Sequence, residues 1–290
     1  MHAKRRIVVQ PMSCPCFFVS DLHGSHRRYQ ALWAAAAAES PMAIFLGGDL
    51  LPGINALKFI HETIEPRVLN LQQKLGNDFP KIFLIPGNDD AAADFANFEH
   101  GEELGLWRQI HNRQEHISDH SVFGYGNVPP TPFMLKDWER YDVSRFVDPG
   151  SLSPEEGHRT VPANADEIRF ATIAEDLKRL ADKENLADSV WLFHSPPYQT
   201  ELDRAGLDGQ SIDHVPLDVH IGSIAIRRFI EAQQPLITLH GHVHESARLT
   251  GHWREQLGRT WMLSAAHDGP ELALVRVDLD RPEAASRQLV

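Results

Sequence analysis

Side chains that can bind metal ions follow five short apolar runs in this sequence. They are Asp21, His23, Asp49, Asn88, His194, His242 and His244. Carboxylate and amide oxygens combined with imidazole nitrogens favour borderline divalent ions such as Mn, Fe, Zn, Co or Ni, whereas Ca prefers oxygens alone. Since no thiolate belongs to the set, a structural zinc site of the cysteine type is not expected. The residue types therefore predict a centre for divalent metal ions.

The apolar runs are predicted β-strands that end at these polar residues. Strands are expected over residues 15–20, 42–46, 81–85, 122–125, 190–193, 236–239, 260–264 and 271–278. Helices are expected over 27–39 (capped by Ser25), 56–75 (interrupted at Pro66), 91–98, 165–183 and 222–232. Alternating strands and helices predict an α/β fold, in which ligands gather beyond the carboxyl ends of the strands.

The metal-binding side chains occur in five short blocks with a fixed order. The blocks are Asp21-x-His23, Gly48-Asp49, Gly87-Asn88, His194 and Gly241-His242-x-His244. Any one of them alone is typical of a turn or a helix cap. All five together, each after a β-prone run, indicate one site.

The five blocks resemble the motifs of the calcineurin-like metallophosphoesterases, which read D-x-H, GD, GN, H and GH-x-H. Later segments resemble the branch related to cyclic-nucleotide phosphodiesterases, namely 194–198, 220–223 and 269–272. The resemblance covers roughly residues 16 to 279. It implies a four-layer αββα sandwich of two mixed sheets flanked by helices.

The resemblance also implies two divalent metal ions. The first would be bound by Asp21, His23, Asp49 and His244, and the second by Asp49, Asn88, His194 and His242. Asp49 would bridge the two ions, which would activate a bridging hydroxide for attack on a phosphate ester.

One block departs from the family pattern. Many members carry a histidine after the Gly-Asn pair as a candidate general acid, whereas this chain carries Asp89. Protonation of a leaving group by Asp89 would require a raised pKa. A poor leaving group would suffer most from the missing histidine, so phosphodiesters or activated esters are favoured as substrates. His220 is the second candidate catalytic residue, and Asp90 is expected to orient a ligand.

Composition limits the remaining choices. The formal net charge of -12 disfavours sequence-independent binding to nucleic acid, so a small phosphoester is the expected substrate. The apolar run after Met1–Arg6 is too short for a signal peptide, which predicts a cytoplasmic protein without a membrane segment. The sequence has only two cysteines, Cys14 and Cys16, which are too few for a disulfide framework. We expect one domain, 1–290, with an inserted cap over 126–164; the oligomeric state is not predicted.

Two alternatives stay open at this stage. The first is a metal-binding interaction scaffold without turnover, which Asp89 suggests, and the second is a nuclease of the same fold. We expect His26 and His267 to be ordinary surface or packing residues and not part of the site, because histidine is often partly buried.

Overall fold

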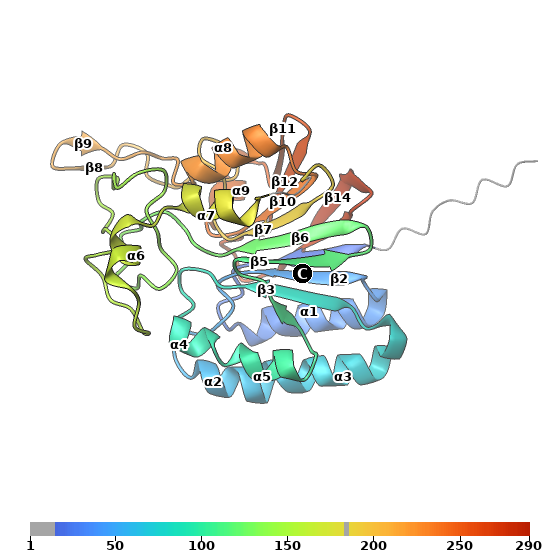
Figure 1. The fold of residues 1–290 in the computed structure, drawn as a ribbon. Helices are drawn as coiled ribbons and strands as arrows, with labels where there is room; N and C mark the ends of the chain where they lie inside the picture. Colours follow the sequence, from blue (N-terminus) through green and yellow to red (C-terminus); the bar gives the residue numbers. More distant parts are fainter. Residues whose placement is uncertain (1–14, 183–185) are drawn as a thin grey trace, which may run out of the picture.

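The computed structural model describes residues 15–182 and 186–290. Met1–Arg6, Cys14 and Lys183 lie outside the described residues, so the expectations placed on them stay predictions. Figure 1 shows two facing β-sheets with helices packed on their outer sides. Within the described ranges, no helix is both long and apolar enough to cross a membrane.

The first sheet has six strands in the order β14-β13-β1-β2-β3-β4. Their bounds are Cys16–Val19 (β1), Ala43–Gly47 (β2), Lys81–Ile85 (β3), Arg108–Gln109 (β4), Ala273–Asp278 (β13) and Arg281–Leu289 (β14). Strands β1 to β4 are parallel, whereas β13 and β14 continue the sheet in antiparallel pairings. The carboxyl ends of β1, β2 and β3 therefore share one edge.

The second sheet has six strands in the order β11-β12-β10-β7-β6-β5. Their bounds are Arg113–Ile117 (β5), His120–Tyr125 (β6), Val190–Phe193 (β7), Ile237–His240 (β10), Arg254–Leu257 (β11) and Thr260–Ser264 (β12). Strands β6, β7, β10 and β12 are parallel, and the two outer strands are antiparallel to their neighbours. A separate hairpin pairs β8 (Ser211–Ile212) with β9 (Val215–Pro216).

Helices cover both outer faces. Beside the first sheet lie α1 (His26–Glu39), α2 (Ala56–Phe59), the π-helical segment η1 (Ile60–Ile64), α3 (Glu65–Leu75), α4 (Ala92–Phe95) and α5 (Phe98–Glu103), with the short 3-10 turn η2 (Gly76–Asp78) after α3. The remaining helices are α6 (Ala165–Phe170), α7 (Ile173–Leu180), α8 (Ile224–Gln233) and α9 (Ser246–Thr250). Ser25 caps α1 as expected, accepting a hydrogen bond from the Arg28 amide.

The expected interruption at Pro66 is wrong in detail. The helical path continues through Pro66, which lies in the first turn of α3 directly after the π-helical segment. A proline ring clashes with the carbonyl group four residues earlier in a regular α-helix. The wider π-turn before Pro66 changes the position of that carbonyl group relative to the proline ring. The predicted helix over 165–183, in contrast, is divided into α6 and α7 at Thr172, which caps α7.

Three apolar cores separate the four layers. Alternation along β1 sends Phe17 and Val19 toward α1 and α3, and sends Phe18 between the sheets. A third core joins Trp191 and Phe193 of β7 to Phe229 of α8. Because each core fills one interface between layers, the predicted four-layer αββα sandwich is confirmed.

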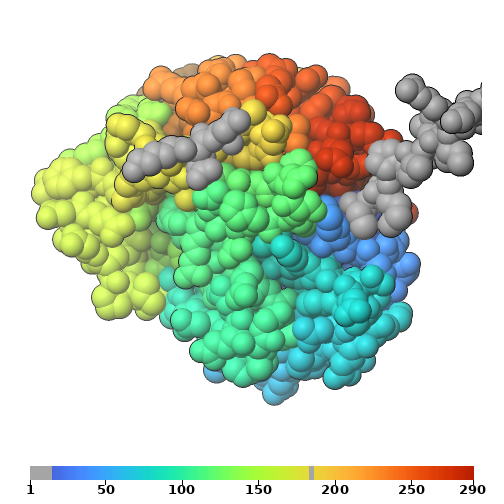
Figure 2. Space-filling model, turned by 45° about the vertical axis from the view of Figure 1, so that its right-hand side comes forward, coloured from blue at the N-terminus to red at the C-terminus, as the bar shows by residue number. Residues whose placement is uncertain are grey.

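The segment 126–164 contains isolated bridges and turns in place of helices or longer strands. A buried ion pair between Lys136 and Glu139, at 2.6 Å, lies inside it, and the Thr131 amide also donates to Glu139. In Figure 2 the yellow-green part of the chain forms a lobe on one side of the molecule. The segment thus has an internal polar core of its own, which fits the proposal of an inserted cap.

Candidate metal centre

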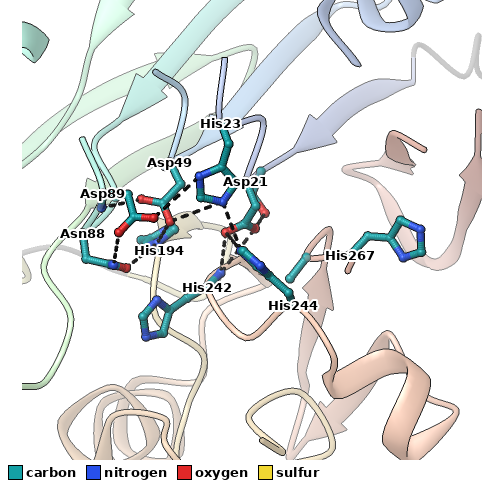
Figure 3. A network of polar contacts seen from close by, with 12 residues as sticks. Asp21, His23, Asp49, Asn88, Asp89, His194, His242, His244 and His267 are labelled. Carbon is teal, nitrogen blue, oxygen red and sulfur yellow. Dashed lines mark hydrogen bonds and ion pairs between the residues drawn. The ribbon is translucent and has the colours of Figure 1, made fainter. Parts of the chain in front are cut away.

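The predicted metal-binding residues gather at the shared edge of the two sheets. Asp21, Asp49 and Asn88 follow β1, β2 and β3, and His194 follows β7. His242 and His244 lie in the loop after β10. Figure 3 shows the loops after β1, β2 and β3 on one side of the site and the loops after β7 and β10 on the other. The two facing sheets therefore supply complementary halves of one cluster.

One group of four side chains is compact enough to hold a metal ion. The ligand atoms of Asp21, His23, Asp49 and His244 all lie within 4.8 Å of one another. His244 Nε2 lies 3.2 Å from Asp21 Oδ1 and 3.2 Å from His23 Nε2. Two imidazole nitrogens that face each other beside buried carboxylates suit a shared cation, because neutral imidazoles present lone pairs to it. The donor set fits a divalent ion.

A second group shares Asp49 with the first. His194 Nε2 lies 3.3 Å from Asp49 Oδ2 and 3.2 Å from Asn88 Oδ1. His194 Nδ1 donates a hydrogen bond of 2.8 Å to the Gly47 carbonyl oxygen, which directs Nε2 toward the carboxylate. Asp49 thus contacts histidines of both groups, as a bridging ligand would.

The side chain of His242 is arranged differently. Its backbone N–H donates to Asp21 Oδ1 at 3.0 Å, and in Figure 3 its imidazole is turned away from the carboxylates. Its ring centroid lies 5.2 Å from that of His194, and burial lowers the pKa of His242 to about 3. His242 is therefore beside the second group, and its role as a ligand stays a proposal.

Four residues of the site adopt left-handed backbone conformations. The φ angles are 56° at Asp21, 44° at His23, 52° at Asp49 and 73° at His242. Such angles are uncommon for residues other than glycine, although Asp, Asn and His tolerate them best. The loops after β1 and β2 also pair, since the Asp21 amide donates to the Gly48 carbonyl at 2.9 Å. The locally bent backbone directs the side chains of Asp21, His23 and Asp49 inward, whereas at His242 it brings the backbone N–H to Asp21.

Glycines permit the close approach of the loops. A Cβ atom on Gly87 would lie 2.2 Å from Asp49 Oδ1, and one on Gly48 would lie 2.5 Å from His194 Nδ1. Neither position can accept a side chain without moving a proposed metal ligand. Close packing of the loops therefore explains why glycine precedes Asp49 and Asn88 at this site.

Asp90 holds the loops after β2 and β3 together. Its fully buried carboxylate accepts hydrogen bonds from the amides of Leu50, Leu51 and Gly87 at 2.8 to 2.9 Å. Leu50 directly follows Asp49, and Gly87 directly precedes Asn88. Asp90 therefore fixes the spacing of two proposed ligands through the backbone.

Asp89 lies at the open side of the site. Its amide donates to Asp49 Oδ1 at 2.8 Å, and its carboxylate accepts a hydrogen bond of 2.9 Å from Asn88 Nδ2. The side chain is 53% exposed, with Oδ2 3.7 Å from His23 Nδ1. Partial burial and the nearby Asp49 carboxylate raise the pKa of Asp89. A raised pKa is the direction that proton donation requires.

The buried acids and histidines are electrostatically interdependent. Burial opposes ionisation of Asp21, but the hydrogen bond and the charge of His244 hold its pKa below the usual range. Burial likewise opposes protonation of His194, but the carboxylates of Asp49 and Asp21 raise its pKa to about 10. The site thus carries strong negative potential from two buried carboxylates, which favours any cation placed there.

In the described part of the chain, the side chains of His220 and His267 make no direct polar contact with this cluster. His220 Nδ1 bonds to the buried carboxylate of Asp203 at 2.8 Å. His267 Nε2 lies 3.2 Å from Glu271, and Figure 3 places its ring apart from the ligands. His26 packs edge-on against Phe59. The packing expected for His26 and His267 agrees with these contacts.

Arg28 is a supporting residue that sequence reasoning missed. Its guanidinium donates to the Asp21 carbonyl oxygen and, at 2.5 Å, to the Gly269 carbonyl oxygen. It thereby joins the loop after β1 to the loop before β13. Its position in the first turn of a helix gives no sequence signal for this contact, because the partners are backbone atoms 7 and 241 residues away.

Comparison with known proteins identifies the class. The family model described as calcineurin-like phosphoesterase matches residues 15–246, most of the chain. The protein therefore belongs to the calcineurin-like phosphoesterase family, and the resemblance drawn from the five blocks is confirmed at the level of the family.

Solved structures agree on the fold. One similar structure has a TM-score of 0.61 and 17% identity, covering 96% of this chain and 99% of its own. The protein TT1561 of Thermus thermophilus has a TM-score of 0.55 and 19% identity, with the same coverage of 96% and 99%. At these identities the similarity concerns the fold alone. No curated protein matches the sequence.

Proposed function

We propose that this protein hydrolyses phosphate esters, preferring phosphodiesters or activated esters, at a centre that binds two divalent metal ions. Asp21, His23, Asp49 and His244 would hold one ion, and Asp49, Asn88, His194 and His242 the other. The observation that carries the proposal is the position of Asp49, whose carboxylate lies within 3.8 Å of His23 on one side and 3.3 Å of His194 on the other.

Divalent ions bound there would supply Lewis-acid chemistry, polarising the phosphoryl group and lowering the pKa of a water molecule. The protein's own contribution is positioning. The Gly47 carbonyl orients the His194 ring, Asp90 fixes the spacing of the Asp49 and Asn88 loops, and Arg28 supports the Asp21 backbone. Such preorganisation accounts for a large share of catalysis in sites that stabilise developing charge.

Asp89 is the proposed proton donor to the leaving oxygen. It combines partial exposure, a raised pKa and hydrogen bonds that hold it beside the proposed ligands. A carboxyl group is a weaker match than imidazole for protonating an alkoxide near neutral pH. Esters whose leaving group needs little protonation are therefore the preferred substrates. His220, oriented by Asp203, is the alternative donor.

The proposed cap over 126–164 would select the substrate. Trp138 Nε1 donates to the Asp90 carbonyl oxygen at 2.5 Å, and Asp137 accepts a hydrogen bond of 2.8 Å from the Ala92 amide. Both contacts attach the cap to the loop and helix that follow Asn88. A small phosphoester is favoured over nucleic acid because the formal net charge is -12.

A comparison of leaving groups tests the proposal. Wild-type protein and the Asp89→Asn variant, loaded with Mn, are assayed on a series of phosphodiesters with leaving groups from p-nitrophenol to simple alcohols. Loss of a general acid should cost about 100- to 10,000-fold on the alkyl esters and far less on the p-nitrophenyl ester. The His220→Asn variant serves as comparison. An equal loss on all esters would remove Asp89 as the donor, and metal binding without hydrolysis of any ester would favour the scaffold.

A further inference from the structure

A second cluster of potential ligands lies on the outer helices of the first sheet. We name it the outer cluster; it consists of His61, Glu65 and His100. His61 belongs to the π-helical segment, Glu65 begins α3, and His100 lies in α5. Figure 1 shows α5 beside the continuous helical path that runs through α2 and α3 in this layer. None of the three residues belongs to the blocks that form the proposed catalytic centre.

The side chains of the outer cluster converge on one carboxylate. Each oxygen of Glu65 contacts one imidazole: Oε2 lies 2.9 Å from His61 Nδ1, and Oε1 lies 2.9 Å from His100 Nδ1. The ligand atoms all lie within 4.8 Å of one another. Two histidines and one glutamate form a ligand set that binds zinc with one position left for water.

Burial of the three side chains differs in a way that suits a metal site. The Glu65 side chain is only 8% exposed, whereas those of His61 and His100 are 37% and 53% exposed. The carboxylate is thus held inside by the packing of α3, and the imidazoles close over it from the solvent side. An ion can reach this position from solvent, and a buried carboxylate gains from a cationic partner.

The backbone around His61 is specialised. The Glu65 amide donates to the Ile60 carbonyl, a bond that spans five residues in place of four. Single π-turns inside α-helices are rare and occur frequently at functional sites. Here the π-turn sets the position of His61 against Glu65, while His100 approaches from a separate helix.

The charge of Glu65 favours a cation at the outer cluster. Its carboxylate is almost fully buried and lies 2.9 Å from an imidazole nitrogen on either side, so that a divalent ion between the three side chains would offset the buried negative charge.

We propose that His61, Glu65 and His100 bind one divalent transition-metal ion, with zinc as the ion that suits the ligands. The bound ion joins α5 to the helical path of α2 and α3. This inference does not depend on the proposed phosphoesterase activity, because the outer cluster contains no residue of the proposed catalytic centre.

Zinc counting with matched variants tests the inference. Full-length wild-type protein is stripped with a chelator, incubated with excess zinc, freed of unbound ions by gel filtration and analysed by mass spectrometry of the metal. The test variant is His61→Gln/His100→Gln, because glutamine can still donate a hydrogen bond to Glu65 but binds zinc poorly. The control is His116→Gln, which replaces an exposed histidine on β5.

The wild type and the control should retain about one zinc ion per chain more than the double variant. Zinc should also raise the thermal midpoint of the wild type more than that of the double variant, while Mn-dependent hydrolysis stays the same in both. Equal zinc content and equal thermal shifts in the wild type and the variant would overturn the proposal. If the double variant does not fold, His100→Gln alone, at the more exposed ligand, is measured in the same way.

Discussion

Replacing Asp90 by asparagine should destabilise the protein and weaken metal binding together. In the native protein the carboxylate accepts hydrogen bonds from the amides of Leu50, Leu51 and Gly87. An asparagine oxygen in the position of Oδ1 can keep the bonds from Leu50 and Leu51. Its amide nitrogen then faces the Gly87 N–H, so that two donors oppose each other without an acceptor.

The expected cost follows from that geometry. One charge-assisted hydrogen bond is lost and a buried donor is left unpaired, which together amount to about 2 to 4 kcal/mol of unfolding free energy. Because Leu50 and Gly87 are adjacent in sequence to Asp49 and Asn88, the loops that carry these ligands should also loosen. Loss of such supporting contacts typically lowers metal affinity by about 10- to 100-fold.

Urea unfolding of the metal-free protein and calorimetric titration with Mn measure the two effects. Asp78→Asn, at an exposed position in the turn after α3, is the control and should change neither quantity. Burial and the Asp49 carboxylate raise the pKa of Asp90 to about 7, against the three amide donors. If Asp90 were protonated at the assay pH, asparagine would mimic it. A cost below about 0.5 kcal/mol with unchanged metal affinity would therefore refute the role of an ionised Asp90.

Three further outcomes are expected. Gly87→Ala should lower turnover by about 100-fold or more, because its Cβ would meet Asp49 Oδ1 at 2.2 Å; Gly53→Ala, where nothing lies within 4 Å, should be neutral in the same assay. Asp89→Asn should leave metal content, measured by mass spectrometry, close to that of the wild type while turnover of alkyl diesters falls. Burial lowers the pKa of His240 to about 4, so the folded state keeps it neutral while the unfolded chain protonates near 6.5. The free energy of unfolding should therefore decline as pH falls from 6.5 toward 4, and protonation of His240 should account for about 2 kcal/mol of this loss at pH 5. Denaturation curves at pH 7 and pH 5 should show a loss of unfolding free energy that is about 2 kcal/mol larger in the wild type than in the His240→Gln variant.

Strands with continuous apolar character were predictable from sequence. The expected bounds of 190–193 and 260–264 coincide with β7 and β12, which lie within their sheet. The polar edge strands β5 and β14 were missed, because their pairing depends on the neighbouring strand and not on their own residues. The continuation of the helix through Pro66 likewise depends on a π-turn that no spacing rule predicts.

The candidate site was predictable where a block fixes both residue type and position. Asp21, His23, Asp49 and His244 come together because each follows a strand whose neighbours bring the ends to one edge. Orientation within a loop was not predictable: the imidazole of His242 is turned away from the carboxylates although its backbone contacts Asp21. The contacts of Arg28 were missed for a related reason, since its partners are carbonyl oxygens brought near by folding.

The most direct test is metal-dependent hydrolysis of bis-p-nitrophenyl phosphate by the wild type and the Asp49→Ala variant. Both proteins are stripped with a chelator and assayed without metal and with Mn, Ni, Co, Zn or Mg, while bound ions are counted in parallel. We expect that the stripped wild type is inactive, that at least one metal restores turnover, and that Asp49→Ala loses both bound ions and activity. Undiminished turnover in folded Asp49→Ala protein would contradict the proposed centre.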